Sequence, residues 1–169
     1  MAKRLFGTDG IRGIAGEFPL DARTAYAFGC ALGSWAADRA PSGAPAEVLI
    51  GMDTRESGPA LARLVAGGLV NRGVRVRFAG LITTPGIAYL ARTDSFTAGV
   101  MISASHNPYR DNGLKAFDHS GFKLPDDQES LIEEEIFRLL DTKIEPREAP
   151  LEADEGLGRA YAEYLRSTF

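Results

Sequence analysis

The chain has 169 residues, of which 44% are hydrophobic and 25% are charged, a composition typical of one soluble globular domain. Its formal charge of −4 argues against a general nucleic-acid-binding role, because such proteins present broad basic surfaces. The sequence shows neither an apolar run of membrane-spanning length nor the apolar core of a signal peptide, and its single cysteine, Cys30, excludes an intrachain disulfide. We therefore expect a cytoplasmic protein without a membrane or nucleic-acid partner.

The chain opens with a turn-rich loop at Gly7–Gly10, whose glycines allow the backbone to approach a ligand closely. Arg12 follows this loop, and on its own it is most simply interpreted as an exposed arginine. Apolar residues recur at intervals of three and four over residues 19–36, which predicts a core-facing helix. Residues 47–53 predict a strand. We interpret Asp53 and Arg55, at its end, as an ion pair that shapes the following loop rather than as catalytic groups.

A second helix is predicted to begin at Ser57 and to end near Gly73. Residues 74–80 alternate apolar and basic side chains, which is typical of a half-exposed strand with Arg75 and Arg77 facing solvent. A short helix then runs from Thr84 to Leu90. This succession of strands and helices predicts a three-layer α/β/α domain around a mostly parallel mixed sheet.

Residues 99–108 begin as an unbroken apolar run, typical of a buried strand, and end in small and polar residues. The carboxyl ends of strands border the ligand crevice in open α/β sheets, so Ser105 is expected where substrates bind. No G-x-S-x-G elbow surrounds it, whereas Arg12 and Lys115 could supply positive charge to phosphoryl oxygens. From the residues alone, a phosphate-carrying serine and a turn that merely ends a strand both stay open.

Asp111-Asn112-Gly113 is predicted to be a turn, and residues 113–118 a short strand that returns beside the serine loop. This return would bring Lys115 near Ser105. His119 lies at the following turn, where we expect it to be exposed and inert.

Asp126 and Glu129 have the spacing of a capping box, which would begin a helix whose acidic residues Glu133–Glu135 face water. Residues 144–150 form a linker marked by prolines, which would let the last helix lean away from the domain body. Leu157 and Tyr161 belong to the apolar stripe of that terminal helix.

Ser103–Pro108 resembles the phosphoserine loop of the α-D-phosphohexomutase family, in which the serine before His-Asn-Pro carries the transferable phosphate. That serine is Ser105 here. Phe6–Gly13 is similar to the amino-terminal signature of a bacterial branch of the family that acts on glucosamine phosphates. Gly51–Arg55 and Asp111–Lys115 match two further motifs of the family, in the same order along the chain.

The resemblance implies the first of four domains, with residues 1–150 as the domain that carries the serine loop and residues 151–169 as a helix leading to an absent second domain. The parent enzyme would interconvert glucosamine 6-phosphate and glucosamine 1-phosphate through a bisphosphate intermediate. Its partners would be this phosphosugar substrate, the remaining mutase domains and a second copy in a homodimer. The chain alone would lack turnover.

The resemblance also assigns roles at the site. The implied catalytic residues are Ser105, His106, Lys115 and Arg12, and the implied phosphate-binding residues are Arg12, Ser105, Asn107 and Lys115. Mg²⁺ would contact the phosphate on Ser105, and its carboxylate ligands would come from the absent second domain. Lys115 and His106 both stay open as the general base. The alternatives are a mutase domain for mannose or glucose phosphates, a phosphosugar-binding module, and a dimerisation module whose serine loop is idle.

Overall fold

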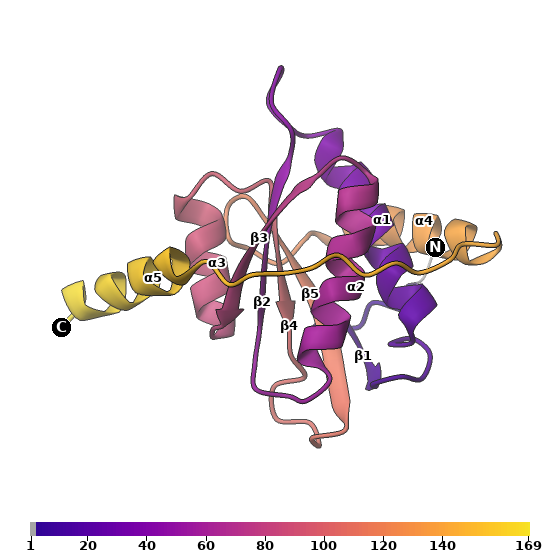
Figure 1. The fold of residues 1–169 in the computed structure, drawn as a ribbon, viewed down its shortest axis with the longest axis horizontal. Helices are drawn as coiled ribbons and strands as arrows, with labels where there is room; N and C mark the ends of the chain where they lie inside the picture. The colour runs from indigo at the N-terminus through magenta and orange to yellow at the C-terminus, as the bar shows by residue number, and fades with distance from the viewer. Residues whose placement is uncertain (1–2) are drawn as a thin grey trace.

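The computed structural model describes residues 3–169, which form one five-stranded mixed sheet in the order β1-β5-β4-β2-β3 (Figure 1). The strands are β1 (Ile11–Ile14), β2 (Glu47–Met52), β3 (Arg75–Leu81), β4 (Ala98–Ile102) and β5 (Asp111–Asp118). β2 pairs in parallel with both β3 and β4, whereas β5 runs antiparallel to β4 and β1. All strands except β5 therefore point in one direction, so their carboxyl ends meet at one edge.

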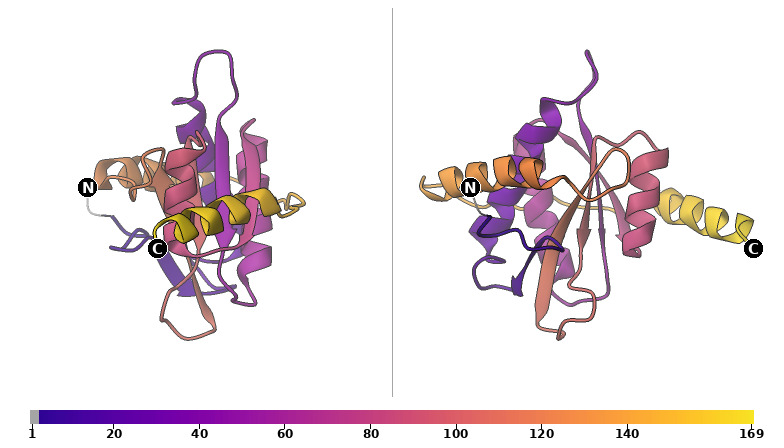
Figure 2. Two further views of the ribbon diagram at one scale, coloured as in Figure 1. Left: turned by 90° about the vertical axis from the view of Figure 1, so that its left-hand side faces the viewer. Right: turned by 180° about the vertical axis from the view of Figure 1, so that it is seen from behind.

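Helices cover both faces of this sheet (Figures 1 and 2). They are α1 (Ala22–Ala37), α2 (Gly58–Asn71), α3 (Thr84–Thr93), α4 (Asp126–Leu140) and α5 (Glu155–Ser167). α1 and α2 pack together over one face with α4 against α1, and α3 covers the other face with the start of α5. The predicted three-layer α/β/α class with a mostly parallel mixed sheet is confirmed. None of the helices in residues 3–169 is long and apolar enough to cross a membrane.

The close contact between α1 and α2 depends on two glycines that face each other. A Cβ built on Gly29 would collide with the main chain of Val65, and one on Gly68 would collide with the main chain of Tyr26. The absence of side chains at these points lets the helices approach backbone to backbone, which no larger residue permits.

The prediction of a turn at Asp111–Gly113 is wrong, because these residues begin β5. Asp111 pairs with Ile14 and Asn112 pairs with Gly13, so this segment forms part of the sheet despite its turn-like composition. The chain reverses earlier instead, where the Asp111 N–H donates to the Pro108 carbonyl at 2.9 Å. The buried Asn112 side chain donates to the Ser57 hydroxyl at 2.8 Å.

The prediction of a capping box at the start of α4 is also wrong. Pro125 precedes the helix and offers no side-chain hydrogen bond. Asp126 and Glu129 instead each lie 2.7 Å from the Lys3 ammonium, and Lys123 contacts Glu129 at 2.8 Å. The hydrogen bond from Lys3 lowers the pKa of Asp126, which keeps this carboxyl ionised.

Glu133 does not face water, contrary to the prediction for Glu133–Glu135. Its side chain is buried, and its carboxylate accepts hydrogen bonds from the backbone N–H groups of Leu5 at 2.9 Å and Phe6 at 3.0 Å, and from that of Arg4. Glu134 is exposed, as predicted. The buried carboxylate thereby fixes the segment that leads into the Gly7–Gly10 loop.

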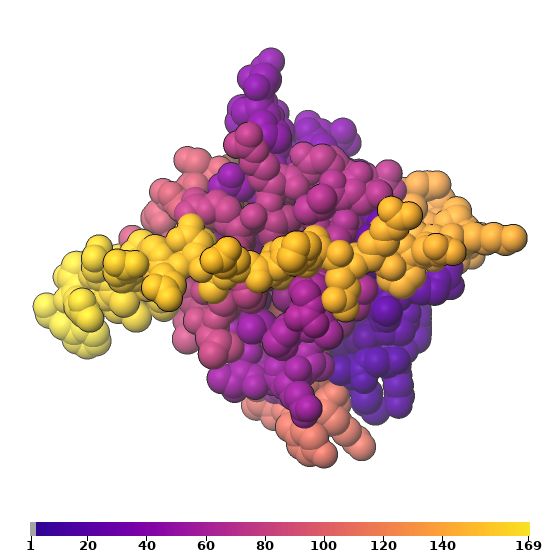
Figure 3. Space-filling view, in the orientation of Figure 1, coloured from indigo at the N-terminus to yellow at the C-terminus, as the bar shows by residue number. Residues whose placement is uncertain are grey.

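Residues 141–154 cross the molecule over α2 before α5 begins (Figures 1 and 3). The Ala149 N–H donates to the Arg63 carbonyl at 3.0 Å, and Ala153 forms a parallel bridge with Phe78 of β3. The prediction that the Arg77 side chain simply faces solvent is wrong, because it contacts Asp154 at 2.6 Å and Asp94 at 3.1 Å. The segment is therefore fastened along its length, and the start of α5 is tied to β3.

Replacing Glu133 with alanine is expected to lower the free energy of unfolding by about 2 to 4 kcal/mol, because three backbone N–H groups lose their partner in a largely buried place. Urea unfolding measures this change. Glu134→Ala removes the same charge from the exposed neighbour and should shift stability by no more than about 0.5 kcal/mol. Equal losses for the two variants would contradict the anchoring role of Glu133.

Candidate active site

A pocket of about 430 Å³ lies at the edge where the carboxyl ends of the parallel strands meet. It is lined by the residues that follow β2 and β3 and by the beginning of the loop after β4, including Ser103 and Ser105. This loop, residues 103–110, forms the lower end of the molecule in Figure 1. Ser105 and its neighbours thus stand at the edge where open α/β sheets bind ligands.

The backbone of Ser105 is left-handed, with φ of 54°, a conformation that residues other than Gly, Asn and Asp seldom adopt. Ser103 supports it: its hydroxyl accepts the Ser105 N–H at 3.0 Å and donates to the Asp53 carboxylate at 2.6 Å. The conformation leaves Ser105 exposed at the tip of the loop. Such strain persists only where the surroundings fix it.

Arg55 supplies most of that fixation. Its Nε lies 3.1 Å from Asp53 Oδ2, and its two Nη atoms donate to four carbonyls of the chain around the serine. These carbonyls belong to Pro108 at 2.7 Å, Asp111 at 3.0 Å, Ser105 at 2.8 Å and Asn107 at 3.0 Å. The side chain is only 9% exposed, so the bonds form largely out of water. The structure agrees with the prediction of an Asp53–Arg55 pair that shapes the loop.

Arg12 reaches the serine from β1. Its guanidinium nitrogens lie 3.4 Å from Ser105 Oγ and 3.4 Å from Asn107 Oδ1, so these three predicted site residues are brought together. The Nε atom of Arg12 is buried and has no hydrogen-bond partner among residues 3–169. One donor of this side chain is therefore unused in the protein as it stands.

Asp9, which was not among the predicted site residues, links Arg12 to Lys115. Its carboxylate lies 3.7 Å from Arg12 Nη2 and 3.5 Å from Lys115 Nζ. Gly10, with φ of 89°, lets this loop approach β5, because a Cβ there would collide with the main chain of Leu114. The only sequence signal for Asp9 is an acid placed within the glycine-rich loop that precedes Arg12.

His106 is exposed, and its side chain makes no hydrogen bond within the described part of the chain. The neighbouring Asn107 is held, because its amide also donates to Asp111 Oδ2 at 3.3 Å. The structure thus fixes Asn107 beside Arg12 and leaves His106 free to meet a group from outside. Its catalytic role stays a prediction.

The carboxylates near Ser105 do not form a magnesium site by themselves. Residues 3–169 contain no group of three or more His, Cys, Asp and Glu side chains able to hold a metal ion. Asp53 is engaged by Arg55 and Ser103, and Asp9 lies between two cations.

The fold and the site define an α/β/α domain that presents a serine, beside cationic side chains, at the carboxyl edge of its sheet. The model of the family described as "Phosphoglucomutase/phosphomannomutase, alpha/beta/alpha domain I" matches residues 3–143. The chain belongs to this family.

Named relatives agree with this assignment. A phosphoglucosamine mutase from Solibacter usitatus (strain Ellin6076) is 64% identical over 165 residues, which are 98% of this chain and 36% of that protein. One from Koribacter versatilis (strain Ellin345) is 50% identical over 171 residues, with the same two coverages. The chain therefore spans about a third of the length of these relatives.

A solved structure shows the same fold. It is that of a Thermus thermophilus protein with a provisional assignment as a phosphomannomutase, at 30% identity and a TM-score of 0.79, covering 97% of this chain and 36% of that one.

Replacing Arg55 with lysine should loosen the serine loop, because an ammonium group cannot reach four carbonyls in the planar fork that a guanidinium provides. Amide hydrogen exchange at residues 105–110 is expected to become at least about tenfold faster, which corresponds to about 1.4 kcal/mol of lost protection. Arg110→Lys, in the same loop but exposed, serves as the matched control. Unchanged exchange in Arg55→Lys would show that the loop holds its shape without the fork.

Proposed function

We propose that this chain is the serine-bearing domain of a phosphoglucosamine mutase, in which Ser105 carries a phosphoryl group between glucosamine 6-phosphate and glucosamine 1-phosphate. The observation that carries the proposal is the approach of Arg12 to 3.4 Å from Ser105 Oγ, on a loop that Arg55 holds in place. The names of the two relatives described above support glucosamine phosphate rather than mannose or glucose phosphates as the substrate.

In the proposed cycle, the bond between phosphorus and Ser105 Oγ breaks as a sugar hydroxyl attacks, and the hydroxyl proton passes to a base. The departing Ser105 oxygen takes up a proton, and the bisphosphate reorients. Ser105 Oγ then gives up its proton and attacks the other phosphorus, whose bond to the sugar oxygen breaks as that oxygen is protonated. Such transfers depend on alignment and on neutralising the phosphoryl oxygens more than on covalent chemistry by the protein. Arg12 and Lys115 would supply that charge, Asn107 would orient Arg12, and Lys115 and His106 are both proposed as the base.

The proposal also covers the metal ion, the domain bounds, the cellular location and the partners. Mg²⁺ would add charge neutralisation at the Ser105 phosphate, with carboxylate ligands from outside this chain. Residues 1–150 would form the domain proper, and residues 151–169 a helix that leads toward further mutase domains. We also propose cytoplasmic action on a phosphosugar substrate, with no nucleic-acid or membrane partner, and homodimerisation stays a prediction.

A chimera tests this function directly. This chain would replace the matching third of the Solibacter usitatus relative, and conversion of glucosamine 6-phosphate to glucosamine 1-phosphate would be measured with magnesium and a trace of the 1,6-bisphosphate. We expect turnover, together with a phosphoryl group that peptide mapping places on Ser105. Ser105→Ala should abolish both, whereas Ser42→Ala, in an exposed loop, should leave both unchanged. Turnover by the Ser105→Ala chimera would refute the assignment of Ser105.

In the same chimera, Arg12→Gln and Lys115→Gln are each expected to lower kcat/KM by about 100- to 1,000-fold, because each removes a cation directed at the transferred group. The double variant should lose less than the product of the two, since both cations act on one phosphoryl group. Arg75→Gln, on the exposed start of β3, controls for the loss of one positive charge. Losses below threefold for both single variants would argue against this charge-neutralising role.

A further inference from the structure

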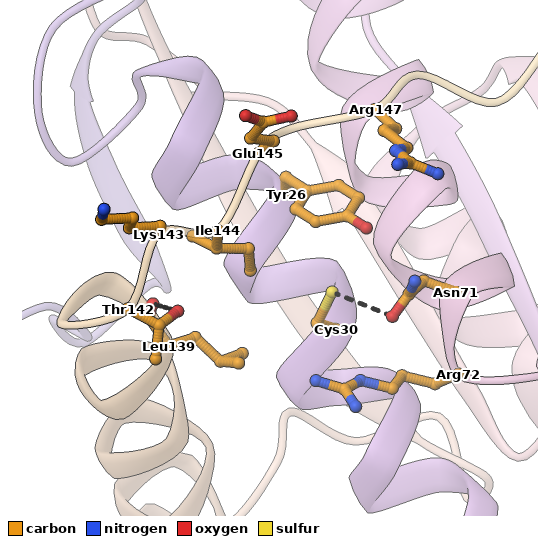
Figure 4. A pocket seen from close by; sticks show the side chains of 10 residues that line it. All are labelled: Tyr26, Cys30, Asn71, Arg72, Leu139, Thr142, Lys143, Ile144, Glu145 and Arg147. Atoms are coloured by element: carbon orange, nitrogen blue, oxygen red, sulfur yellow. Dashed lines mark hydrogen bonds between the residues drawn. The ribbon is translucent and has the colours of Figure 1, made fainter.

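A second pocket, of about 480 Å³, lies between the body of α1 and the C-terminal ends of α2 and α4 (Figure 4). Its walls come from Tyr26 and Cys30 of α1, from Asn71 and Arg72 at the end of α2, and from the segment that follows α4. None of these residues lines the pocket at Ser105. Its volume falls in the range of sites that hold small organic ligands.

Cations outnumber acids in the lining of this pocket, which contains Arg72, Lys143 and Arg147 but only one acid, Glu145. Arg72 and Arg147 form no salt bridge within residues 3–169, although other arginines of the chain, such as Arg63 and Arg138, do. The acid of α4 that acts on Arg72, Glu135, is engaged by Arg138 at 2.6 Å. The pocket therefore holds two guanidinium groups whose charge is open to an outside anion.

Arg72 also carries an unused donor. Its Nε atom is shielded from solvent and has no hydrogen-bond partner among the described residues. A buried polar group without a partner destabilises the folded state, and more so when it is charged. A ligand oxygen would remove that cost, which makes this atom the strongest single indication of a missing partner.

Neutral donors stand beside the two arginines. Figure 4 shows Asn71 and the Tyr26 hydroxyl between Arg147, at one end of the pocket, and Arg72, at the other. Asn71 Oδ1 lies 4.0 Å from the Cys30 thiol, which leaves the amide NH₂ group available as a donor. Burial raises the pKa of Tyr26, so its hydroxyl keeps its proton at neutral pH, while the charges of Arg147 and Arg72 act in the opposite direction.

The rest of the pocket is of a different character. Leu139 and Ile144 form an apolar wall, and the ring of Tyr26 extends from that wall toward the donors. The Glu145 carboxylate, on the rim, points away from Arg72 in Figure 4. The pocket thus joins a cluster of donors to an apolar surface.

We propose that this pocket binds a small organic phosphate monoester, with its phosphate facing Arg72 and Arg147 and its organic part against Tyr26 and Leu139. Guanidinium groups pair with phosphate through parallel charge-assisted hydrogen bonds, and a tyrosine hydroxyl and an amide add neutral ones. The apolar wall favours an ester over the bare anion. The proposal is independent of the function assigned to Ser105.

Titration of the ¹⁵N-labelled chain with phenyl phosphate and, separately, with inorganic phosphate tests this site. All samples carry the substitution Arg12→Gln, which weakens anion binding near Ser105. We expect amide shifts at Asn71, Arg72 and Arg147, and an affinity for phenyl phosphate about tenfold higher than for inorganic phosphate, because only the ester buries apolar surface. Equal affinities, or binding of inorganic phosphate alone, would overturn the assignment to an ester.

Two substitutions then locate the binding energy. Arg72→Gln and Arg147→Gln should each weaken binding of phenyl phosphate about tenfold, since each removes a charge-assisted hydrogen bond. Arg159→Gln, exposed on α5, removes the same charge elsewhere and should change the affinity less than twofold. Arg147 has an exposed side chain, so its variant decides the matter if Arg72→Gln disturbs the end of α2. Absence of amide shifts in the Arg12→Gln background, or an equal loss of affinity in Arg159→Gln, would refute the site.

Discussion

The geometry around Ser105 depends on one buried guanidinium. The loop after β4 turns sharply, so several of its carbonyls converge on one region. Arg55 donates to three of them and to the Asp111 carbonyl at the start of β5, while its Nε pairs with Asp53. Converging carbonyls repel one another, and only a planar cation with several donors can satisfy them together. Because this cluster is largely buried, the left-handed Ser105 is held by side chains that bond to the loop's main chain rather than by secondary structure.

The segment that leads into the loop before Arg12 follows the same physical rule with the charges reversed. There the buried carboxylate of Glu133 collects the N–H groups of Arg4, Leu5 and Phe6, just before the loop that leads to Arg12. An anion orders donors on one side, and a cation orders acceptors on the other. The two reacting sides of the site are therefore positioned separately, each by a charged side chain from a distant part of the chain, and they meet at the 3.4 Å contact between Arg12 and Ser105.

This rule explains which features the sequence could predict. Helices and strands follow from local periodicity, and the layers and the edge that carries Ser105 were predicted correctly for that reason. The errors arose where a distant partner overrides a local pattern: Asp111–Gly113 has turn composition but pairs with β1, and Glu133 sits in an acidic run but binds amides 127 to 129 residues away. Asp9 was missed because its role exists only once Arg12 and Lys115 lie beside it.

Asp9 also partly neutralises the positive charge of Arg12 and Lys115 at the site. Without a phosphate, Arg12 and Lys115 face one carboxylate at 3.7 Å and 3.5 Å, and Asp9 is 56% exposed, so both ion pairs are weak. A phosphoryl dianion on Ser105 would carry more charge and more acceptor oxygens than this carboxylate, and it would lie beside the Arg12 Nη2 atom, which is 3.4 Å from Ser105 Oγ. Under the proposed function, a weak internal anion that a stronger one can displace would keep the two cations in place between phosphorylation events without opposing phosphate binding strongly.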